Sequence, residues 1–208
     1  PNVHTIRQGI SKEEYLYPRD ENDDNSKYTM ADAVFTACFL NTLNRHCDIV
    51  GMANYAPVVN TRGCIYTYPE GIVLRSTYFV FDLYVNYLGD IVLDSWNEDA
   101  AVMTVENKQG EAVTLDSVDI LATSFSDREG LALAAVNKEA EKETSITLSF
   151  PCEGKHVTMY SISGSSTESY NDIGHQDVKI EEKDMGNFYM DMVIDLKPHS
   201  VNIIRIDE

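Results

Sequence analysis

The fold is decided by the stretch Ile49-Val50-Gly51-Met52-Ala53-Asn54-Tyr55-Ala56-Pro57-Val58-Val59-Asn60. Its first part, 49–53, has the length and apolar composition of a β-strand that is buried on both faces. The following residues, Asn54 to Asn60, include Pro57 and are typical of a strand end and a turn. A helical pattern precedes this stretch and another follows it, so the order predicts a parallel α/β unit.

The helix before this stretch is predicted at residues 29–47. Thr29 and Asp32 fit a capping pattern, in which the threonine hydroxyl accepts an early backbone N–H and an acidic side chain is favoured in the first turn. Apolar residues then recur at helical spacing, and Phe39 widens the apolar stripe beyond a narrow face. We therefore expect this helix to be buried on more than one side.

The sequence pattern changes at Gly89. Before it, a short strand is predicted at 71–74 and a helix at 76–88, with Ser76 as its cap and Gly89 as its stop. After it, the apolar period falls from about 3.6 to 2 residues and turn residues recur, which is typical of an antiparallel β-sandwich. Short strands are expected at 102–105, 113–115, 118–125, 131–136, 145–150, 157–162, 178–180, 188–194 and 201–206.

The composition is that of an acidic globular protein. The 208 residues are 43% apolar and carry a formal net charge of -18. Acidic patches at 20–24, 139–143 and 181–184 repel phosphate backbones and anionic lipids, so nucleic-acid and membrane-surface partners are disfavoured, whereas a neutral polysaccharide feels no such penalty. No apolar run reaches the roughly 20 residues that cross a bilayer. The sequence leaves the cellular location open.

Neither a metal nor a cofactor is predicted. The run Asp20-x-Asn22-x-Asp24 resembles the start of a calcium-binding loop, but Asn25 and Ala31 stand where that loop needs glycine and glutamate. The histidines are dispersed without the spacing of metal ligands. The cysteines also lack a short paired spacing, so we expect buried free thiols at Cys38, Cys47, Cys64 and Cys152.

Three motifs in a fixed order carry a family resemblance. They are Arg45-His46-Cys47-Asp48 followed by Val50-Gly51-Met52-Ala53-Asn54, then Val73-Leu74-Arg75-Ser76-Thr77-Tyr78-Phe79-Val80-Phe81-Asp82-Leu83-Tyr84, and finally Leu196-Lys197-Pro198-His199-Ser200-Val201. Together they resemble the C-terminal part of the family 51 glycoside hydrolases, the α-L-arabinofuranosidases. The fold class that this implies is α/β barrel C-terminal elements followed by an all-β antiparallel sandwich, jelly-roll-like. Residues 1–89 would hold the last elements of the (β/α)8 catalytic barrel with a long acidic loop, and 90–208 the C-terminal β-sandwich.

The resemblance also implies a function. The parent protein would be a retaining hydrolase that releases terminal α-L-arabinofuranosyl groups from arabinan or arabinoxylan, with two catalytic glutamates upstream of the helix at 29–47. Glu13 and Glu14 precede that helix, but they lack the glutamate-tryptophan setting of the family's nucleophile. We therefore expect no catalytic residue in this chain, which would be inactive alone.

Asn54, Pro57 and Asn60 are the candidate substrate-binding residues. Active sites of such barrels lie at the C-terminal ends of the strands and in the loops that follow. The segment 54–60 is the only one predicted to reach that face. The alternative is that all three residues have a purely structural role, at a strand end and in a turn.

This sequence departs from the family pattern in two places. Pro57 stands where the family commonly has a glutamine that touches the sugar, and Arg75, Ser76 and Phe79 replace a threonine, a proline and a histidine, which we interpret as structural. A lost polar contact in a carbohydrate pocket can change discrimination by orders of magnitude. A β-glucanase or xylanase on the same scaffold is therefore the alternative enzyme, favoured if Pro57 opens the pocket.

A non-catalytic carbohydrate-binding module is the alternative from another class. It predicts a row of exposed aromatic side chains, whereas the aromatics here mostly fall within apolar strands. Trp96 is expected in a core or interdomain contact more than in a sugar platform.

If the chain is instead part of a hydrolase whose other barrel strands are absent, residues 29–88 should expose a large apolar surface. The partners expected are therefore a polysaccharide or oligosaccharide substrate and either the remainder of the catalytic barrel or a second copy of the chain.

Overall fold

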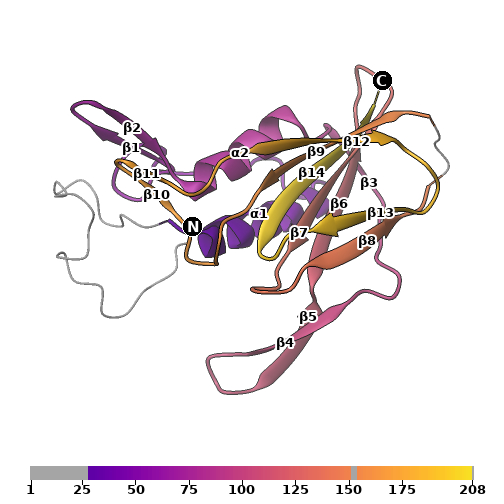
Figure 1. Cartoon of the computed structure of the whole chain (residues 1–208), viewed down its shortest axis with the longest axis horizontal. Helices are drawn as coiled ribbons and strands as arrows, with labels where there is room; N and C mark the ends of the chain where they lie inside the picture. Colours follow the sequence, from indigo (N-terminus) through magenta and orange to yellow (C-terminus); the bar gives the residue numbers. More distant parts are fainter. Residues whose placement is uncertain (1–27, 151–153, 208) are drawn as a thin grey trace.

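The computed structural model describes residues 28–150 and 154–207, which form two α-helices and a set of antiparallel strands (Figure 1). The helices are α1 (Met30–Arg45) and α2 (Ser76–Asn86). The strands are β1 (Ile65–Tyr68), β2 (Gly71–Leu74), β3 (Ile91–Leu93), β4 (Val102–Glu106), β5 (Ala112–Asp116), β6 (Val118–Ser124), β7 (Leu131–Asn137), β8 (Thr144–Leu148), β9 (His156–Ile162), β10 (Asn171–Asp172), β11 (His175–Gln176), β12 (Glu181–Asn187), β13 (Met192–Leu196) and β14 (Ser200–Asp207).

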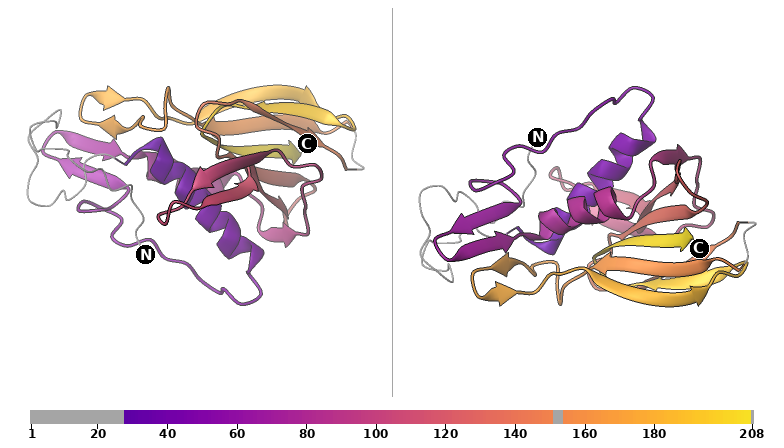
Figure 2. Two further views of the ribbon diagram at one scale, coloured as in Figure 1. Left: turned by 90° about the horizontal axis from the view of Figure 1, so that it is seen from below. Right: turned by 90° about the horizontal axis from the view of Figure 1, so that it is seen from above.

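The central sheet has six strands in the order β12-β9-β14-β7-β6-β3. All of its neighbouring strands pair antiparallel. Strands β8 and β13 pair with each other and pack over one face, whereas α1 and α2 cover the opposite face (Figure 2). The described chain is thus mostly antiparallel sheet with two helices, which is consistent with a β-sandwich.

The central sheet separates two apolar clusters. Strand β7 illustrates the division, since Ala132, Ala134 and Val136 join the cluster under the helices, whereas Leu133 and Ala135 join the cluster under β8 and β13. Side chains alternate between the two faces of a strand. A strand buried on both faces must therefore be apolar at almost every position, as β7 is.

The two observed helices confirm the two that were predicted. The helix expected at 29–47 is observed as Met30–Arg45, and the one at 76–88 as Ser76–Asn86. The Asp32 carboxylate accepts the backbone N–H of Thr29 at 2.8 Å, as the capping pattern predicts. The short strand predicted at 71–74 is β2.

The strand predicted at 49–53 is wrong for this structure. The segment has no strand pairing, and Ile49 and Met52 are 79% and 78% exposed. A buried parallel strand needs a hydrogen-bonded neighbour on each side. In the described residues, the only parallel pairing is an isolated bridge between Val59 and Ile65. The barrel that would supply those neighbours is not in this chain, so the apolar segment faces solvent.

The strands predicted for the sandwich agree with the structure except near 178–194, whereas β3, β10 and β11 were not predicted. The strand expected at 178–180 is absent, and the one expected at 188–194 begins only at Met192. Strand β12 has the charged sequence Glu181-Glu182-Lys183-Asp184, which the pattern marks only as an acidic patch. It is an edge strand that pairs with β9 alone. Edge strands commonly carry charges that block further pairing, which hides them from a search for apolar alternation.

The described cysteines are free thiols, as expected, but they are not all buried. Cys64 is buried, Cys38 is half-buried and Cys47 is exposed, so the expected burial is wrong for Cys47. Burial raises the pKa of the Cys38 thiol to about 12. Cys38 therefore stays protonated and unreactive at neutral pH. Cys152 lies outside the described residues.

His199 couples the stability of the sandwich to pH. It lies between β13 and β14 with a φ of 48°, and its backbone N–H donates to the Glu139 carbonyl at 2.8 Å. Burial lowers the pKa of its imidazole below the ordinary 6.5, and the nearby Lys138 backbone acts in the opposite direction. The folded protein therefore keeps this imidazole neutral where the unfolded chain takes up a proton.

We expect the contribution of His199 to the free energy of unfolding to be fully present above about pH 7 and to be lost as the pH falls through about 6 toward the folded-state pKa. His199→Asn should remove this part of the pH dependence, because asparagine does not titrate and tolerates a positive φ. Urea midpoints for both proteins across this range test it. Parallel pH profiles in the two proteins would contradict the assignment.

Candidate active-site face

One end of the molecule gathers the segments that surround the starts of both helices. Strands β1 and β2 form one hairpin, β10 and β11 form another, and the two lie together beside the first residues of α1 and α2 (Figures 1 and 2). The second hairpin belongs to residues 163–180, which connect β9 to β12 and which we name the sandwich arm. In α/β barrels, the end where the helices begin is the end that carries the active site.

Backbone hydrogen bonds hold the sandwich arm on the first turn of α1. The N–H of Met30 donates to the Ser169 carbonyl at 2.9 Å, and the N–H of Ala31 donates to the Thr167 carbonyl at 3.0 Å. The first N–H groups of a helix have no partner within the helix. The arm satisfies two of them, so it is part of the helix cap.

Asn171 and Ser76 tie the second helix to the same place. The Asn171 amide donates to the carbonyls of Leu74 and Val178 at 2.9 and 2.7 Å, and its oxygen accepts the Val178 N–H at 2.8 Å. The Ser76 hydroxyl lies 2.8 and 2.7 Å from the carbonyl oxygens of residues 28–29. Ser76 was expected to cap α2, but it is the first residue of the helix, and Arg75 occupies the cap position.

Asn60 anchors the loop at 58–64. Its side-chain oxygen accepts the backbone N–H of Thr67 at 2.8 Å and the Thr67 hydroxyl at 3.0 Å, and its backbone φ is 56°. Gly63 allows the loop to close, because a Cβ there would lie 2.4 Å from the Val58 carbonyl oxygen. The amide oxygen of Asn60 is therefore already engaged within the loop.

Arg75 lies under this loop and is only 1% exposed. Its Nη1 donates to the Gly63 carbonyl at 2.6 Å and lies 3.5 Å from the Thr61 carbonyl. Its guanidinium carbon is 4.9 Å from the centre of the Tyr28 ring and 5.6 Å from that of Tyr66. Arginine over an aromatic face is a favourable arrangement, more so when it is desolvated.

Two tyrosines complete this support. The hydroxyls of Tyr28 and Tyr55 both donate to the Arg62 carbonyl, at 2.9 and 3.1 Å. Burial raises the pKa of Tyr55, with the nearby Thr77 hydroxyl acting against it. Tyr55 therefore remains a neutral hydrogen-bond donor at physiological pH. The three successive carbonyls of 61–63 are all engaged by side chains beneath the loop.

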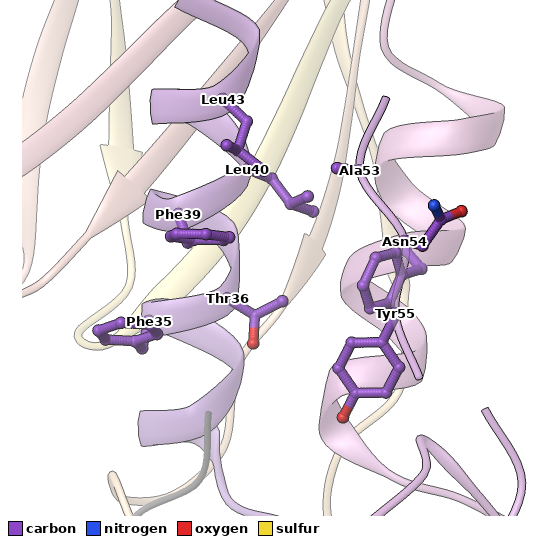
Figure 3. A pocket seen from close by; sticks show the side chains of 9 residues that line it. Phe35, Thr36, Phe39, Leu40, Leu43, Ala53, Asn54 and Tyr55 are labelled. Carbon is purple, nitrogen blue, oxygen red and sulfur yellow. The ribbon is translucent and has the colours of Figure 1, made fainter. Parts of the chain in front are cut away.

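An apolar groove runs between α1 and residues 53–55 (Figure 3). It has a volume of about 240 Å³. Its lining residues are Phe35, Thr36, Phe39, Leu40, Leu43, Ala53, Asn54, Tyr55 and Phe81. Figure 3 shows the α1 side chains on one side and the 53–55 segment, which runs along α2, on the other. Phe35 and Phe39 remain 48% and 37% exposed, so α1 is only partly covered.

The three predicted binding residues lie on one continuous segment. Asn54 is exposed at the groove, Pro57 is exposed after a cis peptide bond, and Asn60 sits half-buried at the loop. The sequence prediction missed Tyr28 and Tyr55 as parts of this face. Neither has a local signal, because the atoms that the two tyrosines contact are brought together only by folding.

The described residues of this face offer binding and packing groups, and we assign no nucleophile among them. Asp32 is engaged in the helix cap, and Asp177 pairs with His175 at 3.0 Å. In the part of the chain that the structure describes, no cluster of His, Cys, Asp or Glu could hold a metal ion, and no helix is long and apolar enough to span a membrane. Glu13, Glu14 and the acidic run at 20–25 lie outside the described residues.

Solved structures share the fold of this chain. The chain superimposes on an α-L-arabinofuranosidase from Thermotoga maritima with a TM-score of 0.79 and 24% identity, covering 92% of this chain and 41% of that one. A family 51 α-L-arabinofuranosidase from Thermotoga petrophila gives a TM-score of 0.77 and 22% identity, with coverages of 91% and 40%. At these identities the likeness establishes the fold alone, which this chain shares with about two fifths of each of these two enzymes.

The sequence then identifies the family. Residues 6–200 match the family described as Alpha-L-arabinofuranosidase C-terminal domain, and the chain belongs to that family. A probable α-L-arabinofuranosidase C from Aspergillus clavatus is 27% identical over 160 residues, which cover 74% of this chain and 30% of that protein. The chain therefore spans about a third of the length of this relative.

Asn171 provides a test of how the sandwich arm is held. Asn171→Ala would leave two carbonyls and one N–H without their present partner, so we expect a loss of about 2–4 kcal/mol in the free energy of unfolding. Urea denaturation of the variant and the parent measures it. Asn97→Ala, which removes one long 3.4 Å bond to the Val118 carbonyl from an exposed side chain, is the matched control. Equal losses in the two variants would show that the arm is not held by Asn171.

Proposed function

We propose that this chain is the C-terminal portion of a retaining glycoside hydrolase that releases terminal α-L-arabinofuranosyl groups from arabinan or arabinoxylan. Membership of the α-L-arabinofuranosidase C-terminal domain family over residues 6–200 carries the proposal. Retaining glycosidases use two carboxyl groups about 5 Å apart, one as nucleophile and one as acid/base. Both glutamates would lie in the part of the parent polypeptide outside this chain, and no metal or cofactor would be needed.

In the parent polypeptide, residues 49–54 would form the last strand of a (β/α)8 barrel. The strand would lie between α1 and α2, which would be the last two barrel helices, and residues 90–208 would be a jelly-roll-like C-terminal sandwich. The end that holds the 58–64 loop and the sandwich arm would then be the catalytic face. Asn54, Pro57 and Asn60 would contribute to the wall of the sugar-binding subsite.

The exposed apolar surface supports this assignment. Phe35 and Phe39 on α1 stand beside the groove, and Ile49 and Met52 extend the surface along the unpaired segment. A soluble protein rarely leaves such a continuous patch open. Because the chain spans well under half of its relatives, the occupant we assign is the preceding barrel of the same polypeptide. Self-association through this surface is the competing outcome.

The alternatives are less well supported. The curated relatives and the solved structures with the higher TM-scores are named as arabinofuranosidases, whereas a xyloglucanase and a glucanase-xylanase match with TM-scores of only 0.54 and 0.50. This order favours arabinofuranosides over a β-glucan or xylan as substrate. For a non-catalytic carbohydrate-binding module, the relevant side chain is Trp96. It is 73% exposed, with its indole N–H 3.3 Å from Glu98, so it does not lie in the core of this chain, and the expected interdomain contact stays a prediction. A single exposed tryptophan does not make the aromatic row that such a module would use.

The activity itself is the first test. The full-length polypeptide that contains residues 1–208 should hydrolyse p-nitrophenyl α-L-arabinofuranoside, and the 208-residue chain alone should not, because it lacks the glutamates. Intact mass must be measured on the same samples, so that a clipped or two-chain assembly is recognised. Full-length protein that is inactive on arabinofuranosides but active on β-glucan or xylan would replace the proposal with the alternative enzyme.

The docking surface has a separate test. Phe35→Ser with Phe39→Ser should lower the thermal midpoint of the full-length polypeptide, because both rings would be buried against the barrel. In the isolated chain, where both rings are already partly exposed, the same change should lower the thermal midpoint by less and should reduce self-association measured by analytical ultracentrifugation. Val193→Ser, a 52% exposed position on β13, is the control for losing one exposed apolar side chain. An isolated chain that is monomeric and stable without these changes would contradict the docking surface.

A further inference from the structure

The geometry points to Arg75 as a positioning residue that sets the shape of the substrate-facing loop at 58–64. This inference rests on the proposed function, because that function places the loop at the catalytic face. Arg75 does not touch the substrate in this scheme. It acts through the loop backbone, which it holds from beneath.

The support is directed at the backbone of the loop. Arg75 donates to the Gly63 carbonyl at 2.6 Å and lies 3.5 Å from that of Thr61, while Tyr28 and Tyr55 donate to the carbonyl of Arg62. These side chains come from the segment before α1, the groove segment and the cap of α2. The loop backbone is therefore held by side chains from three separate segments of the chain.

The loop has little freedom left once these bonds are made. The Asn60 N–H donates to the Ile65 carbonyl at 2.7 Å, and Asn60 and Thr61 both adopt positive φ values of 56° and 47°. Residues other than glycine seldom adopt that conformation, so the surrounding contacts must stabilise it. Loss of the Arg75 bonds should let the loop relax toward ordinary φ values, which moves the backbone that follows Pro57.

Arg75 is one of the departures of this chain from the motif that it resembles. It stands where the family motif usually has threonine, a side chain too short to reach a carbonyl with a planar fork of donors. Pro57 stands where the family usually has a sugar-contacting glutamine. Arg75 lies beneath the loop and Pro57 immediately precedes it, so both differences fall on neighbouring backbone, and in this scheme the loop has a shape of its own.

The experiment uses the full-length polypeptide with Arg75→Thr, Arg75→Met and Arg75→Lys. Steady-state kinetics on p-nitrophenyl α-L-arabinofuranoside should show KM raised about ten-fold or more for the first two variants, with a smaller change in kcat, because a displaced loop weakens substrate binding. Arg75→Lys keeps the cation but not the fork, so its KM should lie between those of the wild type and Arg75→Thr.

Trypsin supplies a readout that does not need activity. The bond after Arg62 lies in the held loop, so it should resist cleavage in the wild type and be cut in Arg75→Met, with the site mapped by mass. Gly63→Ala should expose the same bond while leaving Arg75 in place, because its Cβ would collide with the Val58 carbonyl. Equal resistance of the wild type and Arg75→Met would overturn the inference.

Asn137→Ala is the matched control for general destabilisation. Asn137 is another buried side chain that donates to loop carbonyls, those of Lys142, Leu196 and Lys197, but it lies in the sandwich. The Asn137→Ala substitution should lower the thermal midpoint of the full-length polypeptide without changing its KM. If the Arg75 variants behave in the same way, with only kcat reduced in proportion to the folded fraction, Arg75 has no positioning role. If the wild type is inactive on arabinofuranosides, the proposed function fails, and the trypsin result alone decides whether Arg75 holds the loop.

Discussion

The layer of apolar contacts between the two helices and the central sheet is the constraint on which the rest of this structure depends. Leu121, Val136 and Ile203 on the sheet and Ala33 and Leu83 on the helices are almost completely buried in it. Burial on this scale fixes the direction of both helices relative to the sheet. Their first turns therefore end up at one end of the molecule, where their free N–H groups need partners.

The sandwich arm follows from that requirement. Its carbonyls satisfy the first turn of α1, and Asn171 links it to the residue before the cap of α2. The sheet and the helices are thus joined twice, once through apolar packing and once through polar contacts at the helix starts. For this reason we regard the sandwich as part of the framework of the proposed catalytic face, and not as an independent module tethered to it.

The candidate active-site face contains residues that hold the backbone and residues that are exposed to solvent. Arg75, Tyr28 and Asn60 direct their polar atoms at the chain itself, and Asn54 and Pro57 face outward. Arg75 carries a positive charge into a site that is almost closed to water, and there its hydrogen bonds and aromatic neighbours compensate for lost hydration. A chain organised in this way can shape a binding site while the reacting groups come from elsewhere in the parent protein.

The sequence by itself determined the two helices, most of the sandwich strands and the family, because these depend on local periodicity, capping residues and motifs such as the one around His199. It also nominated Asn54, Pro57 and Asn60 as substrate-binding residues, which stays a prediction. It could not show that the apolar run at 49–53 would lack strand partners, that the charged β12 would pair at a sheet edge, or that Arg75 would lie beneath a loop beside Tyr28. Those features depend on neighbours distant in sequence. Only tertiary structure decides them, because hydrogen bonding and burial are properties of the surroundings of a residue and not of its identity.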